Sequence, residues 1–170
     1  TLERQTLVEL VNLARCSASG GNNQPLKYMV FNEPNDAARI FPHLQWAGAL
    51  TDWDGPAEGE RPAAYIEILL DKQIKEAGGV DHGIAGWSIM LGATDRGYGG
   101  CLVGAIERKG LRAELDLDDR YDILLVCALG RPAEKVVLED APPGGEVTYY
   151  RDEHDVHHVP KRAIDELIIN

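Results

Sequence analysis

The stretch from Ala63 to Leu70 (AAYIEILL) constrains the fold more than any other part of this sequence. It is mostly apolar on both faces of an extended chain, which predicts a strand at the centre of a sheet rather than at its edge. A second apolar run at residues 121–129 (YDILLVCAL) predicts another strong strand. Shorter strands are expected at residues 27–31 (KYMVF) and 99–105 (GGCLVGA).

Helices are expected between these strands. Leu7, Leu10, Val11 and Ala14 recur at helical spacing, so residues 4–15 predict a first helix, with TLVE at residues 6–9 as a capping box. Further helices are expected at residues 34–44, 81–96 and 107–115, and in a last segment that opens at residues 160–162. The apolar face of that last helix would carry Ile164, Leu167 and Ile168.

The remaining C-terminal segments predict little regular structure. Residues 134–146 are polar and proline-rich and should meander over the surface, whereas residues 147–151 and 156–159 should form a terminal pair of short strands. Helices therefore alternate irregularly with four or five strands, which indicates an α/β or α+β class around one sheet. A length of 170 residues fits a single domain spanning residues 1–170.

The helix at residues 81–96 has an unusual composition. Gly83, Gly86 and Gly92 are interspersed with alanine, serine and large apolar residues. Each glycine costs a helix about 1 kcal/mol relative to alanine. Several in one helix indicate that another backbone comes close, which would be a second helix, a partner subunit or a flat ligand.

Composition excludes several classes of partner. The net charge of −11 argues against nucleic acid and anionic membrane surfaces, although a few local cations can still bind a phosphate. No apolar run is long enough to span a bilayer, and no basic leader precedes an apolar stretch, so we expect a cytoplasmic protein. Cys16, Cys101 and Cys127 are widely spaced, which predicts reduced core thiols rather than disulfides.

The segment ARCSASGGNNQP at residues 14–25 is the most informative for chemistry. A helix that runs into a loop of serine, glycine and asparagine offers free N–H groups and short polar side chains, which suit a ligand with phosphate, ribityl or ring carbonyl groups. The alternative is a solvated loop whose glycines and asparagines simply allow positive φ. The residues alone leave both interpretations open.

This segment resembles the nitroreductase family, in which an arginine, a Ser/Gly/Asn turn and Gln-Pro precede the first strand. DHGIAGWSIMLGATDRGYGGCLVGAI at residues 81–106 resembles the same family's central helix, glycine-rich turn and the strand beneath the flavin. YDILLVCALGRPAE at residues 121–134 and VPKRAIDELI at residues 159–168 are similar to its late core strand and its cationic terminal segment. The four segments occur in family order along nearly the whole chain.

The resemblance implies a three-layer sandwich, with a mainly antiparallel sheet between helices, assembled as a homodimer with FMN at the interface. Its implied flavin contacts are Arg15, Ser17, Ser19, Asn22 and Gln24 in the turn, Leu102, Val103, Gly104 and Ala105 along the isoalloxazine, and Lys161 and Arg162 at the phosphate. A backbone N–H near Gly104 would point at flavin N5, and no side chain is expected to act as a catalytic acid or base. The helix at residues 81–93 would form the dimer core.

The implied activity is ping-pong transfer of electrons from NADH or NADPH to an electron-poor acceptor such as a nitroaromatic, quinone or enone. Family members usually carry an Arg-Ser-x-Arg-like phosphate-binding element ahead of the first matched helix, and the printed sequence lacks one. A non-catalytic flavin- or ligand-binding module and another flavin chemistry, such as reductive dehalogenation or flavin fragmentation, therefore stay open. Trp46 and Trp53 are candidates to wall a substrate pocket, or are packing aromatics.

Other motifs give weaker signals. DEHDVHH at residues 152–158 contains potential metal ligands, but it lacks the ordered set that a zinc site needs and fits a polar terminal hairpin in which His154 and His158 share a strand face. No metal site is therefore expected. GYGG at residues 97–100 precedes a strand and is no dinucleotide fingerprint, and the absence of GxSxG argues against a serine hydrolase.

Overall fold

The computed structural model describes residues 2–169, which group into two compact units. The first unit comprises residues 2–46 and 56–131, and the second comprises residues 47–55 and 132–169. Among the described residues, no helix combines the length and apolar character that crossing a membrane requires.

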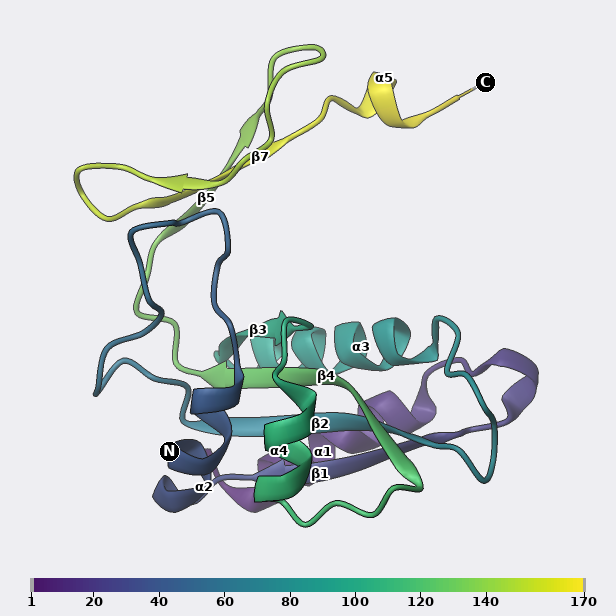
Figure 1. The fold of residues 1–170 in the computed structure, drawn as a ribbon. Helices are drawn as coiled ribbons and strands as arrows, with labels where there is room; N and C mark the ends of the chain where they lie inside the picture. Colours follow the sequence, from purple (N-terminus) through teal and green to yellow (C-terminus); the bar gives the residue numbers. More distant parts are fainter. Residues whose placement is uncertain (1, 170) are drawn as a thin grey trace. The chain divides into compact units, whose positions relative to one another are not determined.

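The first unit is built on a four-stranded antiparallel sheet in the order β1-β2-β4-β3 (Figure 1). Its strands are β1 (Leu26–Phe31), β2 (Ala64–Asp71), β3 (Gly99–Val103) and β4 (Tyr121–Gly130). All eight residues of β2 are buried, and β2 lies between β1 and β4. The apolar run at residues 63–70 is therefore a central strand, as its pattern predicts.

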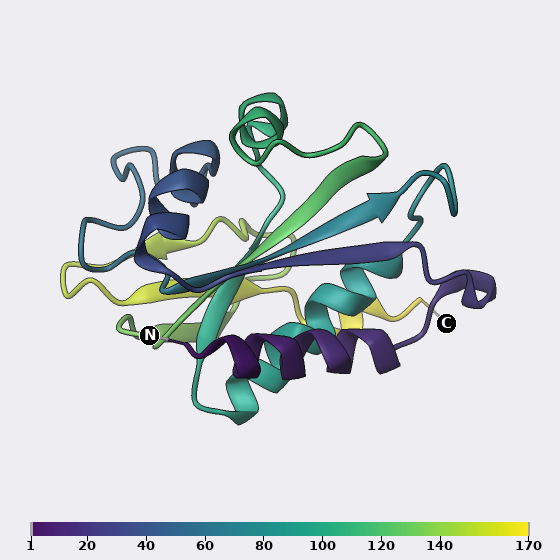
Figure 2. The same ribbon diagram turned by 90° about the horizontal axis from the view of Figure 1, so that it is seen from below.

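One face of the sheet is covered by α1 (Arg4–Cys16) and α3 (Asp81–Asp95), which pack against each other (Figure 2). Leu7 and Leu10 from α1 and Ile89 from α3 form a core with Ile66 and Ile68 of β2. Leu7 and Leu10 are at helical spacing, and Ile66 and Ile68 are two residues apart in the strand. Each element therefore contributes one of its faces to this core.

The opposite face is covered by α2 (Pro34–Ile40), the short 3₁₀ turn η2 (Phe41–His43) and α4 (Arg108–Glu114). Ile40 and Leu111 from these helices pack against Tyr65, Leu69 and Val126 of the sheet. Two cores on the two faces of one antiparallel sheet make this unit a three-layer α/β sandwich, which confirms the predicted fold class.

Two of the three glycines of α3 are explained by neighbours in the same chain. A Cβ on Gly92 would collide with Leu13 of α1, and a Cβ on Gly86 would lie 3.1 Å from Leu102 of β3. Gly83 faces open space. The expected close approach is therefore made by α1 and β3, and the prediction that a dimer core accounts for these glycines is wrong for Gly86 and Gly92.

Two local predictions are corrected. Helix α1 begins at Arg4 with Glu3 as its N-cap, two residues before Thr6, so the capping box at residues 6–9 does not form. Of the three cysteines, only Cys127 is a core thiol, because Cys16 and Cys101 are exposed. Cys16 is the last residue of α1, where its side chain has no core to enter.

The second unit contains a three-stranded sheet in the order β5-β7-β6. Strand β5 (Val136–Asp140) is parallel to β7 (His157–Lys161), and β6 (Tyr150–Arg151) is antiparallel to β7. The terminal strand pair is thus present, but the segment at residues 134–146 contains a strand instead of a meander. The predicted last helix is reduced to the short α5 (Ile164–Leu167), because Pro160 and Lys161 belong to β7.

The expected apolar face of the last helix is not buried within the described chain. Ile164, Leu167 and Ile168 are each more than half exposed. The predicted last helix is therefore present only as the four residues of α5, and Ile168 lies just beyond its end.

Candidate functional site

The turn between α1 and β1 has an unusual backbone. It includes the 3₁₀ turn η1 (Gly20–Asn22), and Gly21, Asn22 and Gln24 adopt positive φ angles of 61°, 54° and 50°. Glycine and asparagine tolerate this conformation, whereas a residue such as Gln24 pays about 1–2 kcal/mol. The turn at residues 17–24 must therefore be held by contacts outside its own backbone.

Asp81, the first residue of α3, supplies those contacts. Its carboxylate accepts a hydrogen bond of 2.6 Å from the Ser19 hydroxyl and one of 3.0 Å from the Gly20 N–H. The Ser19 oxygen in turn accepts a 3.0 Å bond from the Gln24 N–H. Asp81 is 3% exposed, and the bond from Ser19, followed by that from Gly20, lowers the pKa of its carboxyl below the ordinary value.

Beside this turn lies a hollow of about 210 Å³. Its lining includes four of the predicted site residues, namely Arg15, Ser17, Ser19 and Gln24, together with Lys27 and Tyr28 of β1 and Asp81 and Ala85 of α3. Two cations and several hydroxyl and amide groups therefore converge on one concave surface. The two cations match a phosphate, and the serine hydroxyls, whose hydrogens are used within the chain, offer only their oxygens to a ribityl hydroxyl.

The individual contacts of these residues refine their roles. The Arg15 Nε donates to Asn12 Oδ1 at 2.9 Å, and the Ser17 hydroxyl donates to the Ala14 carbonyl at 2.6 Å. Asn22 belongs to the turn but does not line the hollow, and its carbonyl and side-chain oxygens accept bonds from Gln24 Nε2. Burial, with smaller contributions from Cys127 and Asp81, raises the pKa of the Tyr28 phenol to about 12, so it stays protonated.

Residues 102–105 comprise the end of β3 and the two residues after it, and we call this segment the strand exit. Its strand residues alternate between the two faces of the sheet. Leu102 packs beside Gly86 of α3, whereas Val103 is buried in the core on the other face of the sheet. Gly104 and Ala105 follow as exposed residues beyond the end of β3. Val103 therefore has only its backbone left for any ligand, and Gly104 and Ala105 are the accessible part of this segment.

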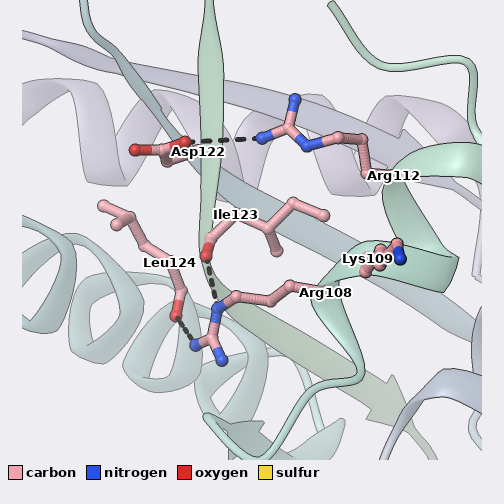
Figure 3. Close-up of a pocket in the computed structure, with 6 residues that line it drawn as sticks. All are labelled: Arg108, Lys109, Arg112, Asp122, Ile123 and Leu124. Carbon is pink, nitrogen blue, oxygen red and sulfur yellow. Dashed lines mark hydrogen bonds and ion pairs between the residues drawn. The ribbon is translucent and has the colours of Figure 1, made fainter. Parts of the chain in front are cut away.

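Arg108 fixes the position of this exit, a role that the sequence pattern did not reveal. Its guanidinium donates to the Gly104 carbonyl at 3.1 Å and to the Ile123 and Leu124 carbonyls at 2.9 and 3.3 Å, the last two drawn in Figure 3. The Ala105 carbonyl accepts a 2.9 Å bond from the Gln45 N–H. Both exposed residues are thus anchored through their carbonyl oxygens.

A second hollow, of about 480 Å³, adjoins Arg108, Lys109 and Arg112 (Figure 3). Arg112 donates to the Leu117 and Asp118 carbonyls at 3.3 and 2.9 Å and also pairs with the Asp122 carboxylate at 3.4 Å (Figure 3). The contacts of Arg108 and Arg112 thus connect α4 to the start of β4.

Helix α3 connects the two predicted groups within the first unit. Its residues Asp81 and Ala85 line the hollow beside the turn, and Gly86 contacts Leu102 of the strand exit. The structure therefore places the turn at residues 17–24 and the start of the exit along the same helix. Trp46, also in this unit, stacks on Phe41 and packs against the core, as a packing aromatic does.

The predicted phosphate ligands belong to the second unit. Lys161 ends β7, and Arg162 follows it and forms a 3.7 Å ion pair with Glu166. Trp53 lies in the same unit, where the Arg151 guanidinium sits 4.6 Å from the centre of its ring.

The DEHDVHH segment forms a turn and the start of β7 rather than one continuous strand. His158 contacts Glu139 through Nδ1 at 3.0 Å and Asp152 through Nε2 at 3.3 Å. Within residues 2–169, no three histidine, cysteine or acidic side chains are grouped closely enough to hold a metal ion.

Three solved structures share the architecture described above. An FMN-dependent nitroreductase from Clostridium difficile R20291 is 19% identical, with a TM-score of 0.63 over 79% of each chain. CLA-ER, an enone reductase of gut-bacterial fatty acid saturation metabolism, is 16% identical, with a TM-score of 0.66 over 79% of this chain and 81% of its own. The NADPH:FMN oxidoreductase from Vibrio harveyi is 17% identical, with a TM-score of 0.60 over 78% of this chain and 61% of its own. The fold is thus that of the nitroreductases.

The sequence itself matches the nitroreductase family over residues 60–131, from just before β2 to the end of β4. Together with the shared fold, this match supports the resemblance to the nitroreductase family that the motifs indicate. A comparison with curated protein sequences gives no significant match. The turn at residues 17–24 and the tail at residues 159–168 lie outside the matched segment.

Proposed function

We propose that this protein is an FMN-dependent NAD(P)H oxidoreductase that works as a homodimer. The observation that carries the proposal is the hollow at the turn, where Arg15, Ser17, Gln24 and Lys27 surround a concave surface next to the family-matched helix α3. The solved structures of similar fold include proteins described as FMN-dependent and as an NADPH:FMN oxidoreductase, the latter in complex with NAD⁺.

The residues present fit part of FMN. A phosphate and ribityl chain need cations and hydrogen-bond donors, which the lining of this hollow provides. Its volume of about 210 Å³ falls below the roughly 300–1,000 Å³ of sites that enclose a whole small ligand. The hollow therefore suits one portion of the cofactor, and a second subunit would enclose the rest.

Helix α3 also supplies a surface for that second subunit. Val80, Ile84, Trp87 and Leu91 follow one another at intervals of four, three and four residues and are exposed, Trp87 by 61%. A stripe of large apolar side chains at this spacing lies along one side of a helix and is unfavourable in water. We propose that two copies pair through this stripe about a twofold axis.

Bound FMN would supply the redox chemistry by accepting hydride from NADH or NADPH and passing electrons to an electron-poor acceptor such as a nitroaromatic, quinone or enone. The chain would contribute binding and orientation. The Gly104 and Ala105 carbonyls are held by Arg108 and Gln45, so the backbone of this exit is preorganised for main-chain contact with a planar ring. No side chain is assigned as an acid or base.

The test is direct. FMN is titrated into apo-protein while the quenching of flavin fluorescence is followed, and the loaded protein is then mixed with NADH or NADPH without oxygen. We expect saturable binding and loss of the flavin absorbance near its visible maximum. Protein that takes up no FMN would overturn the proposal. Protein that binds FMN but is reduced by neither nucleotide would instead indicate a flavin-binding module or another flavin chemistry.

The dimer is tested separately by exchanging one residue of the stripe. Trp87→Lys should convert the assembly to a monomer in sedimentation, because a charge replaces the largest exposed apolar side chain of α3. Val136→Lys, which changes an exposed apolar residue of the second unit, is the matched control and should leave the mass unchanged. A monomeric wild type, or a dimeric Trp87→Lys variant, would contradict pairing through this stripe.

A further inference from the structure

We infer that Asp81 is a positioning residue for the flavin site, and that the Ser19 hydroxyl acts through Asp81 rather than by touching the flavin. This inference rests on the proposed function, since it concerns the turn at residues 17–24 that would bind FMN. It changes the role of one predicted ligand and adds one residue that the sequence motifs did not indicate.

The hydrogen-bonding capacity of Ser19 is the first argument. A serine hydroxyl has a single hydrogen to donate, and Ser19 donates it to Asp81 at 2.6 Å. Its oxygen already accepts the Gln24 N–H at 3.0 Å. The hydroxyl therefore has no hydrogen left for a phosphate or carbonyl oxygen of a ligand, so it serves as a link between the turn and α3.

The environment of Asp81 is the second argument. The carboxylate is 3% exposed, and its two oxygens accept from Ser19 and from the Gly20 N–H. A buried carboxylate is costly unless donors surround it. Lys75 and His82 also contribute favourable charge, so the ionised form is stabilised by every polar group described around it.

The backbone of the turn is the third argument. Gln24 has a φ angle of 50°, which its side chain disfavours, and it follows Gly21 and Asn22, which also have positive φ but tolerate it. The bonds from Gly20 and Gln24 to Asp81 and Ser19 bracket this strained segment on both sides. Without them the turn would relax toward ordinary conformations, and the side chains of Arg15 and Gln24 that line the hollow would no longer converge.

The position of Asp81 also links the turn at residues 17–24 to helix α3. It is the first residue of α3, the helix whose exposed stripe we assign to dimer formation. One carboxylate thus joins the cofactor turn to the helix of the proposed subunit interface. The geometry couples the shape of the turn to the placement of that helix.

The experiment compares FMN binding by apo-proteins carrying Asp81→Ala, Ser19→Ala and both changes. We expect Asp81→Ala to weaken FMN binding by about tenfold or more, because two donors lose a charged acceptor. Ser19→Ala should weaken binding less, and the double variant should bind no more weakly than Asp81→Ala alone. Asp95→Asn, an exposed aspartate at the other end of α3, is the matched control and should bind as the wild type does.

Two further measurements separate positioning from general destabilisation. Backbone amide NMR of the apo-protein should show that Asp81→Ala shifts the Gly20 and Gln24 N–H signals and speeds their exchange, while the core of β2 stays protected. Asp81→Asn retains one acceptor oxygen and should restore binding in part.

The outcomes are distinguishable from those of the proposed function. Wild-type protein that binds no FMN overturns both the function and this inference. Wild type that binds FMN, together with an Asp81→Ala variant of equal affinity and unchanged Gly20 and Gln24 signals, overturns the inference alone. Additive losses in the double variant would show that Ser19 has its own contact with FMN, which contradicts the assigned role of its hydroxyl.

Discussion

Glu67 offers the sharpest test of the core, because it is an acid in the middle of a central strand. It is fully buried, and neither carboxyl oxygen has a hydrogen-bond partner. Its neighbours across the sheet are Met29 and Val126, so the carboxyl lies in the core that faces α2 and α4. The predicted perturbation is Glu67→Gln, which removes the charge and keeps the shape.

The magnitude follows from the pKa of this carboxyl. Burial raises it from 4.5 to about 7, and the nearby Arg39 lowers it only in part. Each pKa unit corresponds to about 1.36 kcal/mol, so ionising Glu67 in the fold costs about 3 kcal/mol. Because the pKa of Glu67 is higher in the folded state than in the unfolded state, the wild type has its full stability only while this carboxyl is neutral. That stability is fully present below about pH 4.5, declines as the pH rises and is lost above about pH 7.

The assay is urea unfolding followed by tryptophan fluorescence between pH 5 and 8.5, at one protein concentration and saturating FMN, since dimerisation and ligand binding shift apparent stability. At pH 8.5, Glu67→Gln should exceed the wild type in free energy of unfolding by about 3 kcal/mol. At pH 5 the folded Glu67 is neutral and only the unfolded chain is partly ionised, so the difference should shrink to about 1 kcal/mol or less.

The control is Glu114→Gln, because Glu114 pairs at 2.7 Å with Arg39, the cation whose charge also lowers the Glu67 pKa, but is itself exposed. It should change stability by no more than about 1 kcal/mol, equally at both pH values. Superimposable pH profiles for Glu67→Gln and the wild type would refute the reasoning. A variant that is less stable at high pH would show instead that the ionised carboxylate has a stabilising partner.

Three other perturbations have defined outcomes. Arg108→Lys keeps the charge, but a lysine cannot reach all three carbonyls. We therefore expect slower reduction of bound flavin by NADH in stopped-flow absorbance, with FMN affinity unchanged. Equal rates would contradict the anchoring of Gly104. His158 contacts carboxylates through both ring nitrogens, and a neutral imidazole has only one N–H. The bonds with Glu139 and Asp152 raise the pKa of His158, so the stability that His158 contributes is present below its ordinary pKa and is lost as the pH rises through the folded pKa. Limited proteolysis of residues 132–169 should therefore accelerate over that pH range in the wild type and not in His158→Gln. Lys161→Ala should weaken FMN binding by about tenfold or less if this cation neutralises the phosphate, and an unchanged Kd would remove Lys161 from the site.

Much of the fold follows from local patterns in the sequence. Residues 63–70 are apolar at both alternating positions, and an extended chain with that pattern must be covered on both faces, as β2 is. The helical spacing of Leu7, Leu10 and Ala14 places α1, and glycines in α3 correctly indicated a close neighbour. These signals lie within one turn or one strand, so the sequence alone contains them.

The sequence pattern was less informative where the outcome depends on which face a residue takes. The predicted flavin contact of Val103 would have to come from its backbone, because the alternation of β3 directs its side chain into the core. Cys101 was expected in the core and is exposed. A five-residue strand with apolar residues on both sides does not specify by itself which side meets which layer.

Local patterns in the sequence were therefore enough to predict most of the elements, the central strand, the resemblance to the nitroreductases and the polar turn at residues 17–24, because each rests on neighbouring residues. Only the tertiary structure decided that Asp81 meets Ser19 across 62 residues of chain, that Arg108 holds Gly104, and that Glu67 is sealed between strands and helices. Those contacts arise when separate elements pack into layers, and their energies depend on burial, which no local pattern encodes.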